Sequence, residues 1–393
     1  MHKKIMAVIP ARGGSVGIPG KNIIPIAGSP LITYTINAAL QSAYINRIIV
    51  STDNNNIARI SQNAGTEVVR RPEAISGDNS KSEDAILHVL DVLHNKENYQ
   101  PDIIVFLQCT SPLMTGDDID GTIEALINKN ADSALAVTDF HYFLWRKNND
   151  ESMEGLNHDK NIRELRQNKK KDYLETGSIY VMRCQGFIEK KHRFFGNTVS
   201  YFMPKERCLE IDDPVDLKIA EVLIRDAKSK YRIALLPKNI EAVIFDFDGV
   251  FTDNSVIIKQ NGDESVICNR GDGMGISIIR NLGIPVLVLS SENSPVVEAR
   301  CNKLKIEYRQ GLQKKEKTMV DWLNEKHYSL ENIIYVGNDI NDIECLKIVG
   351  CSVVVNDAMP YVKQYAEIVL TNKGGHGAIR ELADMIYNMK EGN

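Results

Sequence analysis

The sequence is poor in several features that mark specialised classes of protein. It has 7 cysteines among 393 residues, with no CxxC pair and no Cys/His cluster, which argues against a disulfide scaffold and a thiolate zinc site. No apolar run approaches the roughly 18 residues of a membrane-spanning helix. The apolar run at 5–9 is also too short for a signal-peptide core. We therefore expect a soluble cytoplasmic protein with free thiols.

The chain also lacks a strong surplus of either charge. Lys plus Arg number 47 and Asp plus Glu number 52, which gives a formal net charge of −5. This balance argues against binding to nucleic acid or to an anionic membrane, although single basic loops can still bind phosphates. Hydrophobic residues make up 43% and charged residues 25%, which is typical of globular proteins and excludes disorder, collagen and coiled coil. The length suggests two or three domains.

Short apolar runs alternate with helical patterns along the whole chain. The runs that predict buried strands are 5–9, 47–51, 103–107, 133–137, 242–247, 286–289, 333–336, 351–355 and 368–370. Because buried strands separated by helices form parallel sheets covered on both faces, we predict an α/β protein with two Rossmann-like domains. Ser29 and Pro30 predict the start of a helix, as N-cap and first helical residue.

A short basic stretch is the expected boundary between the two domains. The last helix of the first half is expected to end near Lys228, and residues 229–239 resemble a linker. We therefore predict domains at 1–228 and 240–393.

Two other segments stand apart from this alternation. Segment 140–175 is polar and predicts a mobile or interface excursion from the sheet. Residues 255–268 contain Asn261-Gly262 between two short strands, which favours a type I′ hairpin. Such a hairpin could cover the ligand edge of the second sheet or be a simple edge hairpin.

A glycine-rich loop follows the first predicted strand. Residues 10–22 have the sequence PARGGSVGIPGKN, in which four glycines let backbone N–H groups approach a ligand closely. Arg12 and Lys21 add two cations, so the loop predicts a phosphate cradle at the mouth of a parallel sheet. It matches neither GxxxxGK[ST] nor GxGxxG, and the alternative is a flexible turn with solvated charges.

The loop resembles the signature of the CMP-sugar synthetases, the cytidylyltransferases that activate sialic acid and related 3-deoxy-2-keto acids. Four further motifs follow in that family's order: Arg70-Arg71-Pro72 ahead of a turn with Ser80 and Ser82, QCTSPL at 108–113, ETGSIY at 175–180, and Glu210-Ile211-Asp212. The resemblance covers about residues 1–228. It implies CTP and a nonulosonic acid as substrates.

The resemblance also implies roles for individual residues. Arg12 and Lys21 would hold the triphosphate and stabilise the leaving pyrophosphate. The residues expected to bind nucleotide and sugar are Gly13, Gly14, Ser15, Asn22, Arg71, Ser82, Gln108 and Tyr180. Glu210 and Asp212 would hold Mg²⁺, the alternative being an acidic cluster at a helix N-terminus. Departures from the family's usual residues lie near the sugar end, at Cys109, Met114 and Glu175-Thr176.

A second catalytic pattern begins the second domain. Asp246 and Asp248 follow a buried strand at i and i+2 and face the same side. Burying two carboxylates there is costly unless a cation or a proton is shared. This DxDG resembles the first motif of the haloacid-dehalogenase superfamily, whose phosphatases work through an aspartyl-phosphate. Later motifs match in order at Ser290, Lys315 (with Lys314 as the alternate), Asp339 and Asp342.

This second resemblance implies a phosphatase site. Asp246 would attack phosphorus, and Asp248 would protonate the leaving alcohol and then activate water. Ser290 and Lys315 would bind phosphate oxygens. The residues expected to hold Mg²⁺ are Asp246, Asp248, Asp339 and Asp342.

The segment GGHGAIRE at 374–381 resembles the signature of a narrower phosphatase branch. That branch acts on 3-deoxy-2-keto sugar acid phosphates and is typically tetrameric. Gly375 and Arg270 are therefore expected substrate contacts, although Arg270 could equally be a solvated loop arginine. His376 stands where the branch often has arginine.

As a whole, the chain resembles the two-domain N-acylneuraminate cytidylyltransferases of animals, whose second domain lacks the nucleophile and assembles the oligomer. Because Asp246 and Asp248 are both present here, we predict a homotetrameric bifunctional enzyme. It would hydrolyse a sialic-type acid 9-phosphate and couple the free acid to CTP. Three alternatives remain open: the equivalent enzyme for 3-deoxy-manno-octulosonate and its 8-phosphate, a non-catalytic oligomerising second domain, and a sugar-nucleotide sensor.

Overall fold

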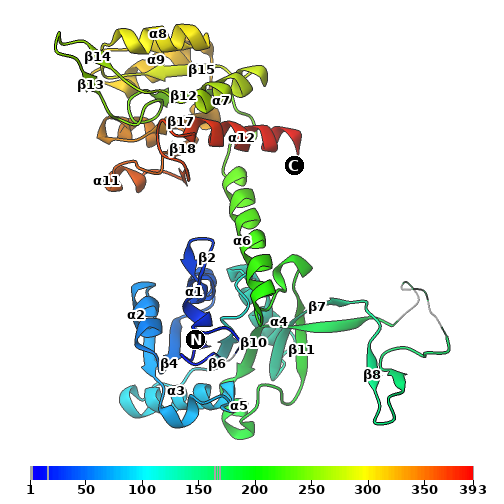
Figure 1. Ribbon diagram of the computed structural model, residues 1–393. Helices are drawn as coiled ribbons and strands as arrows, with labels where there is room; N and C mark the ends of the chain where they lie inside the picture. The colour runs from blue at the N-terminus through cyan, green and yellow to red at the C-terminus, as the bar shows by residue number, and fades with distance from the viewer. Residues whose placement is uncertain (1–2, 16, 163–164, 166, 168–169, 393) are drawn as a thin grey trace. The chain divides into compact units, whose positions relative to one another are not determined.

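The computed structural model describes residues 3–15, 17–162, 165, 167 and 170–392 (Figure 1). The chain forms two compact units, Met1–Asp226 and Ala227–Asn393. Each unit is built around its own mainly parallel sheet, which confirms the predicted α/β class. Among the described residues, no helix is both long enough and apolar enough to cross a membrane.

The first sheet has the strand order β11-β7-β10-β6-β1-β4-β5. Its strands are β1 (Ile5–Pro10), β4 (Arg47–Thr52), β5 (Glu67–Arg70), β6 (Ile103–Leu107), β7 (Ser133–Phe140), β10 (Asp172–Arg183) and β11 (Thr198–Phe202). β10 runs antiparallel to its neighbours β6 and β7, whereas the other pairs are parallel. The carboxyl ends of β1, β4 and β6 therefore meet at one edge of the sheet.

The helices of the first unit cover both faces of this sheet. They are α1 (Leu31–Gln41), α2 (Asn55–Asn63), α3 (Ser82–Glu97), α4 (Gly116–Asn128), α5 (Cys184–Lys190) and the start of α6 (Pro214–Ala234), with 3-10 turns η1 (Lys21–Ile23), η2 (Glu73–Ile75) and η4 (Lys205–Arg207). Along β1, Ile5, Ala7 and Ile9 pack with α1, α2 and α4. Met6 and Val8 pack with α3 and α5. Alternate side chains point to opposite faces, so a strand covered on both sides is apolar throughout.

Two local predictions in the first half were wrong. Ser29–Pro30 is a short strand, β3, paired with Pro25–Ile26 (β2), and helix α1 begins only at Leu31. The tight turn at Ala27 and Gly28, both with positive φ, brings the two strands together and keeps Pro30 extended. The helix expected to end near Lys228 instead continues to Ala234.

The segment 140–175 contains a small hairpin formed by β8 (Trp145–Lys147) and β9 (Met153–Gly155). Its apolar side chains are exposed, including Tyr142, Leu144 and Trp145. Five residues of the segment, 163–164, 166 and 168–169, lie outside the described residues, so the predicted excursion is seen only in part.

The second sheet is parallel, with the order β16-β15-β12-β17-β18-β19. Its strands are β12 (Ala242–Asp246), β15 (Val286–Leu289), β16 (Glu307–Arg309), β17 (Ile333–Gly337), β18 (Cys351–Val354) and β19 (Ile368–Val369). The helices are α7 (Arg270–Asn281), α8 (Pro295–Leu304), α9 (Lys315–Lys326), α10 (Ile343–Leu346), α11 (Pro360–Lys363) and α12 (Ala378–Glu391), with 3-10 turns η5 (Leu330–Asn332) and η6 (Ile340–Asp342). Leu236, from the stretch predicted as a linker, is buried in this unit's core.

The predicted hairpin is present but has a different turn. Its strands are β13 (Ile257–Ile258) and β14 (Glu264–Ser265). Gly262 has φ +86°, whereas Asn261 has no positive φ, so the turn is not type I′. The Gly262 amide bonds the Lys259 carbonyl at 2.9 Å, and the Lys259 amide bonds the Asp263 carbonyl at 2.8 Å. This is the pattern of a type I turn closed by a glycine bulge.

Candidate functional sites

A cavity of about 370 Å³ opens at the carboxyl edge of the first sheet. Eight of the predicted residues line it: Arg12, Ser15, Lys21, Asn22, Arg71, Ser82, Gln108 and Asp212. They come from the glycine-rich loop, the turn after β5, the start of α3, the end of β6 and the segment before α6. The structure thus brings together motifs separated by up to 200 residues, as the predicted nucleotide site requires.

The two predicted triphosphate cations are paired with acids at the cavity wall. Arg12 Nη1 donates to the Gly77 carbonyl at 2.6 Å and lies 3.2 Å from the Asp78 carboxylate. Lys21 Nζ donates to the Ile211 carbonyl at 2.8 Å and lies 3.4 Å from Asp212 Oδ1. Both carboxylates are exposed, so these are weak surface pairs that an entering phosphate can replace.

Other contacts hold the loop itself in place. Arg71 is buried and donates to the Ser51 carbonyl at 2.8 Å, and burial lowers its pKa. The side-chain nitrogen of Asn22 donates to the Arg12 carbonyl at 3.0 Å. The Gly13 amide donates to Asp53 at 2.8 Å. Gly13 and Gly14 do not line the cavity, so their contribution is to the shape of the loop.

The predicted acidic pair sits beside the cavity. Asp212 lines it, and Glu210 lies deeper, where burial and the neighbouring Asp212 raise its pKa. Thr110 donates to Glu210 at 3.3 Å. Gly177 has φ +67°, and a Cβ there would lie 2.5 Å from a Glu210 oxygen. Glycine in the ETGSIY motif is therefore required for Glu210 to reach this position.

Tyr180 lies behind the cavity wall rather than in it. It is 2% exposed, and its ring stacks on Phe106, a wall residue, with centroids 5.3 Å apart. Its hydroxyl donates to Glu175, and burial raises its pKa. The Arg193 guanidinium lies 4.6 Å from the Tyr180 ring centroid. In this arrangement Tyr180 supports the wall, and the sequence did not reveal that Phe106 is the residue facing the cavity.

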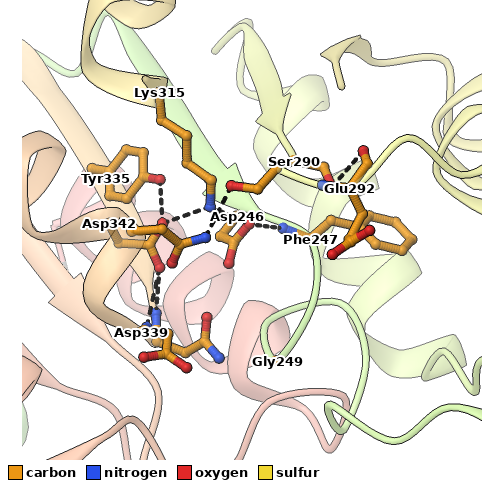
Figure 2. Close-up of polar contacts among 12 residues, drawn as sticks. Asp246, Phe247, Gly249, Ser290, Glu292, Lys315, Tyr335, Asp339 and Asp342 are labelled. Carbon is orange, nitrogen blue, oxygen red and sulfur yellow. Dashed lines mark hydrogen bonds and ion pairs between the residues drawn. The ribbon is translucent and has the colours of Figure 1, made fainter. Parts of the chain in front are cut away.

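The second site is organised by a buried lysine between two aspartates (Figure 2). Lys315 Nζ donates to Asp246 Oδ1 at 2.6 Å and to Asp342 Oδ1 at 2.8 Å. The Phe247 amide also donates to Asp246 Oδ1, at 2.7 Å. Because both bonds fall on Oδ1, the other oxygen of Asp246 is left to face a ligand. Asp246 ends β12 and Lys315 begins α9. Of the two lysines considered from the sequence, Lys315 and Lys314, it is Lys315 that contacts Asp246.

Burial sets the charges of this cluster. Burial and the nearby Asp342 raise the pKa of Asp246, and the Lys315 ammonium opposes that rise. Burial lowers the pKa of Lys315, but the two carboxylates outweigh it and leave that pKa raised. Lys315 therefore stays a cation and offsets part of the rise in the pKa of Asp246.

Asp248 lines a larger cavity beside the β13–β14 hairpin, whereas Ser290 is fully buried and does not line it. The cavity, of about 780 Å³, is lined by Asp248, by Glu292 and by hairpin residues from Asn254 to Val266. Burial and then Glu292 raise the pKa of Asp248, which favours a protonated acid. Ser290 Oγ accepts the Glu292 amide at 3.1 Å. Glu292 was not predicted, although it lies only two residues after Ser290.

The structure corrects the role predicted for Asp342. Its Oδ1 accepts Lys315 and the Tyr335 hydroxyl, at 2.8 and 2.7 Å. Its Oδ2 accepts the amides of Asn338 and Asp339, at 2.8 and 3.2 Å (Figure 2). Both oxygens thus accept hydrogen bonds in a fully buried position, so Asp342 holds the loop and Lys315 in place and has no oxygen without a partner to offer a metal.

Asn338 is a site residue that the sequence reasoning missed. It is 7% exposed, and its side-chain oxygen is buried without a hydrogen-bond partner. A Cβ on Gly249 would lie 2.0 Å from the side-chain nitrogen of Asn338, so Asn338 packs against the DxDG loop. Asp339 instead uses Oδ1 to accept the Ile340 amide at 2.7 Å. Asn338 is the first residue after β17, which pairs with β12, the strand that ends at Asp246, and this position is the signal that could have identified it.

The GGHGAIRE segment packs against the loop that follows Asp246. A Cβ on Gly374 would lie 1.8 Å from the Gly249 carbonyl, and one on Gly375 would lie 2.6 Å from the Asp253 amide. Glu381 accepts the Asn372 amide at 2.8 Å and the Arg232 guanidinium at 2.6 Å. The structure therefore gives Gly375 a packing contact, not a place in the cavity lining.

Arg270 is the first residue of α7 and is exposed outside that lining. The structure therefore places neither of the two substrate contacts expected for the phosphatase branch, Arg270 and Gly375, at the cavity.

Comparisons with known proteins match each half of the chain to a family. The Cytidylyltransferase family model matches residues 6–231, and a haloacid dehalogenase-like hydrolase model matches 306–382. N-acylneuraminate cytidylyltransferase A of Danio rerio is 31% identical over 99% of this chain and 90% of its own length. Pseudaminic acid cytidylyltransferase of Campylobacter jejuni is 28% identical over 56% of this chain and 97% of its own length.

Solved structures similar to the second unit include a deoxy-D-mannose-octulosonate 8-phosphate phosphatase from Haemophilus influenzae. It is 35% identical and covers 39% of this chain and 91% of its own, with a TM-score of 0.38. The family match over more than half of the chain, together with the full-length relative, confirms the two resemblances seen in the motifs. The chain belongs to the cytidylyltransferase family and joins a cytidylyltransferase domain to a haloacid dehalogenase-like domain.

Proposed function

We propose that the protein activates a sialic-type nonulosonic acid in two reactions. The second domain would hydrolyse the 9-phosphate of the sugar acid. The first domain would then transfer the cytidylyl group of CTP to the freed acid, with release of pyrophosphate. The observation that carries this proposal is that each unit holds its own assembled site, at the cavity with Arg12 and Lys21 and at the Asp246–Lys315 pair.

In the first reaction a sugar hydroxyl attacks the α-phosphorus of CTP and the bond to pyrophosphate breaks. The chain's contribution is to position the substrates and to neutralise charge on the leaving group. Arg12 and Lys21 supply that charge once the phosphates displace Asp78 and Asp212 from them. Glu210 and Asp212 are hard oxygen donors suited to Mg²⁺, which would bridge phosphate oxygens when bound.

In the second reaction the free carboxylate oxygen of Asp246 attacks phosphorus and the sugar alcohol leaves. Asp248 gives its proton to the departing oxygen, which fits the raised pKa of Asp248. Water then attacks the aspartyl-phosphate while Asp248 takes up the water's proton, which returns both aspartates to their starting states. Lys315 and Ser290 would bind the phosphate oxygens.

The residues of the second site fit a magnesium ion. The donors would be the Asp248 carbonyl and the unpartnered oxygen of Asn338, with Asp246 as a third ligand. Among the described residues no group of three or more His, Cys, Asp or Glu side chains could hold a metal, so backbone and amide oxygens must contribute. When bound, the ion would neutralise charge on the transferring phosphoryl group.

This donor set predicts that Asn338→Asp will tighten magnesium binding about tenfold. A carboxylate in place of the amide oxygen adds a negative charge beside the cation. Without the ion the same charge is buried and unpaired, so the variant should unfold at a lower temperature than the natural protein. Thermal unfolding at increasing Mg²⁺ measures both effects.

Asn341→Asp is the matched control, because Asn341 is exposed and bonds Ser291 at the surface. Equal magnesium midpoints for Asn338→Asp and the natural protein would show that Asn338 is not a ligand.

The substrate is tested by one assay on the intact protein. Pyrophosphate release from CTP is measured with neuraminic, deaminated neuraminic, legionaminic and octulosonic acids, and phosphate release with the phosphates of the same acids. We expect turnover of a nonulosonic acid and its 9-phosphate. Preference for octulosonate and its 8-phosphate would reassign the substrate, and phosphate release from none of them would leave the second domain a non-catalytic scaffold. Binding without any turnover would indicate a sensor.

We also propose a homotetramer assembled through the second domain. Support comes from the hairpin, which exposes Val256, Ile257, Ile258 and Ile267, with Ile258 68% exposed. Such a patch is costly to leave in water and suits burial in a partner copy. Ile258→Asp should therefore shift the mass measured by light scattering from tetramer to smaller species. An unchanged mass would contradict assembly through the hairpin.

A further inference from the structure

We propose that Lys81 is a third cation for the triphosphate of the nucleotide, an inference that rests on the proposed cytidylyl transfer. Lys81 lines the same cavity as Arg12 and Lys21. It lies between Ser80 and Ser82 in the turn of the second motif, but the family resemblance assigns it no role. It was not among the residues expected from the sequence.

The first support for this role is that the other cations of the cavity already have partners in the protein. Arg12 and Lys21 are each paired with a carboxylate, and Arg71 is buried against Ser51. In the described part of the chain, the ammonium of Lys81 has no hydrogen bond or ion pair. A ligand phosphate therefore does not have to displace a protein carboxylate from Lys81, as it does from Arg12 and Lys21.

The second support is the position of Lys81 next to Arg12. The Arg12 guanidinium contacts Gly77 and Asp78, in the same turn of chain that carries Lys81. Lys81 directly precedes α3, and Ser80 and Ser82 on either side of it also line the cavity. A phosphate held by Arg12 thus lies near Lys81, close to the positive end of a 16-residue helix.

The third support is that the backbone of Lys81 is fixed while its side chain is free. Its amide donates to Asp84 in the first turn of α3, at 3.3 Å. This contact fixes the position of the Lys81 backbone. The exposed ammonium at the end of the flexible side chain can then adjust its position to contact a bound phosphate. Lys81 is therefore suited to join Arg12 and Lys21 at the outer phosphates, which are lost as pyrophosphate.

The test is a comparison of CTP and CMP binding by calorimetry. CMP lacks the two outer phosphates, so Lys81→Met should weaken CTP binding about tenfold or more and change CMP binding less than about twofold. Lys81→Arg keeps the charge and should bind CTP nearly as well as the natural protein. Lys96→Met, on the exposed last turn of the same helix, is the matched control and should leave both affinities unchanged.

Each other outcome overturns a defined statement. Equal losses for CTP and CMP would place Lys81 at the base, the ribose or the α-phosphate, and no loss would remove it from the site. An Arg variant as weak as the Met variant would show that charge is not what matters. If the natural protein binds neither nucleotide, the proposed transfer itself fails, which is distinct from a failure of the role given to Lys81.

Discussion

Asp246→Asn is expected to abolish sugar-phosphate hydrolysis, with kcat lower by roughly 10⁴-fold or more, and to leave cytidylyl transfer unchanged. The amide cannot attack phosphorus, and Asp342, the other carboxylate bonded to Lys315, already has both oxygens engaged. Lys315 keeps its bond to Asp342, so the variant should still fold. Phosphate release and CMP-sugar formation are measured on the same sample.

The control for this variant is Asp321→Asn, which changes the same chemical group on the exposed face of α9. It should hydrolyse the sugar phosphate at the natural rate. Hydrolysis retained by Asp246→Asn would show that another group attacks phosphorus. Absence of hydrolysis in the natural protein as well would favour the scaffold alternative, in which the second domain only assembles the oligomer.

The sequence predicted the parts of both sites that depend on where strands end. β1, β6, β12 and β17 all lie within a residue of their expected ranges, because runs of apolar residues buried on two faces are unambiguous. Polar residues placed just after such strands must meet at one sheet edge. Arg12, Gln108 and Asp246 were predictable for this reason, whereas Lys315 was identified only through the family resemblance.

The metal ligands of the second site were not fully predicted, because they depend on which side-chain oxygens already accept hydrogen bonds from the protein. Asp342 and Asn338 lie four residues apart, and their types alone favour the acid as the metal ligand. The fold reverses this choice, because Tyr335 and Lys315 saturate one oxygen of Asp342 while the Asn338 oxygen faces the site unpartnered. Hydrogen-bond saturation is a property of tertiary packing, and no local pattern reports it.

The helix boundaries show the same limit at a smaller scale. Ser29 and Pro30 have good N-terminal propensity, yet pairing with β2 keeps them extended. Likewise Asn-Gly favours a type I′ turn, yet the hairpin closes with a glycine bulge. The local preferences of these residues, for a helix start and for a type I′ turn, are each worth only a fraction of a kcal/mol. In both places the pairing of the two flanking strands decides the backbone conformation instead.

Lys21→Met is expected to lower kcat/KM for CTP by roughly 10³-fold, with sugar-phosphate hydrolysis unchanged. The ammonium of Lys21 is held at the cavity wall by the Ile211 carbonyl, so it is already positioned where charge develops on the leaving group. Methionine keeps most of the apolar stem and removes only the charge. The initial rate of pyrophosphate release at several CTP concentrations separates a change in kcat from one in KM.

Lys129→Met, an exposed lysine after α4, controls for loss of a surface charge and should transfer at the natural rate. A Lys21→Met rate within about threefold of the natural protein would remove Lys21 from the reaction. Taken with Asp246→Asn, the variant also tests whether the two sites work independently. Each substitution should silence one activity alone, because each cation and each nucleophile described here makes its contacts within its own unit.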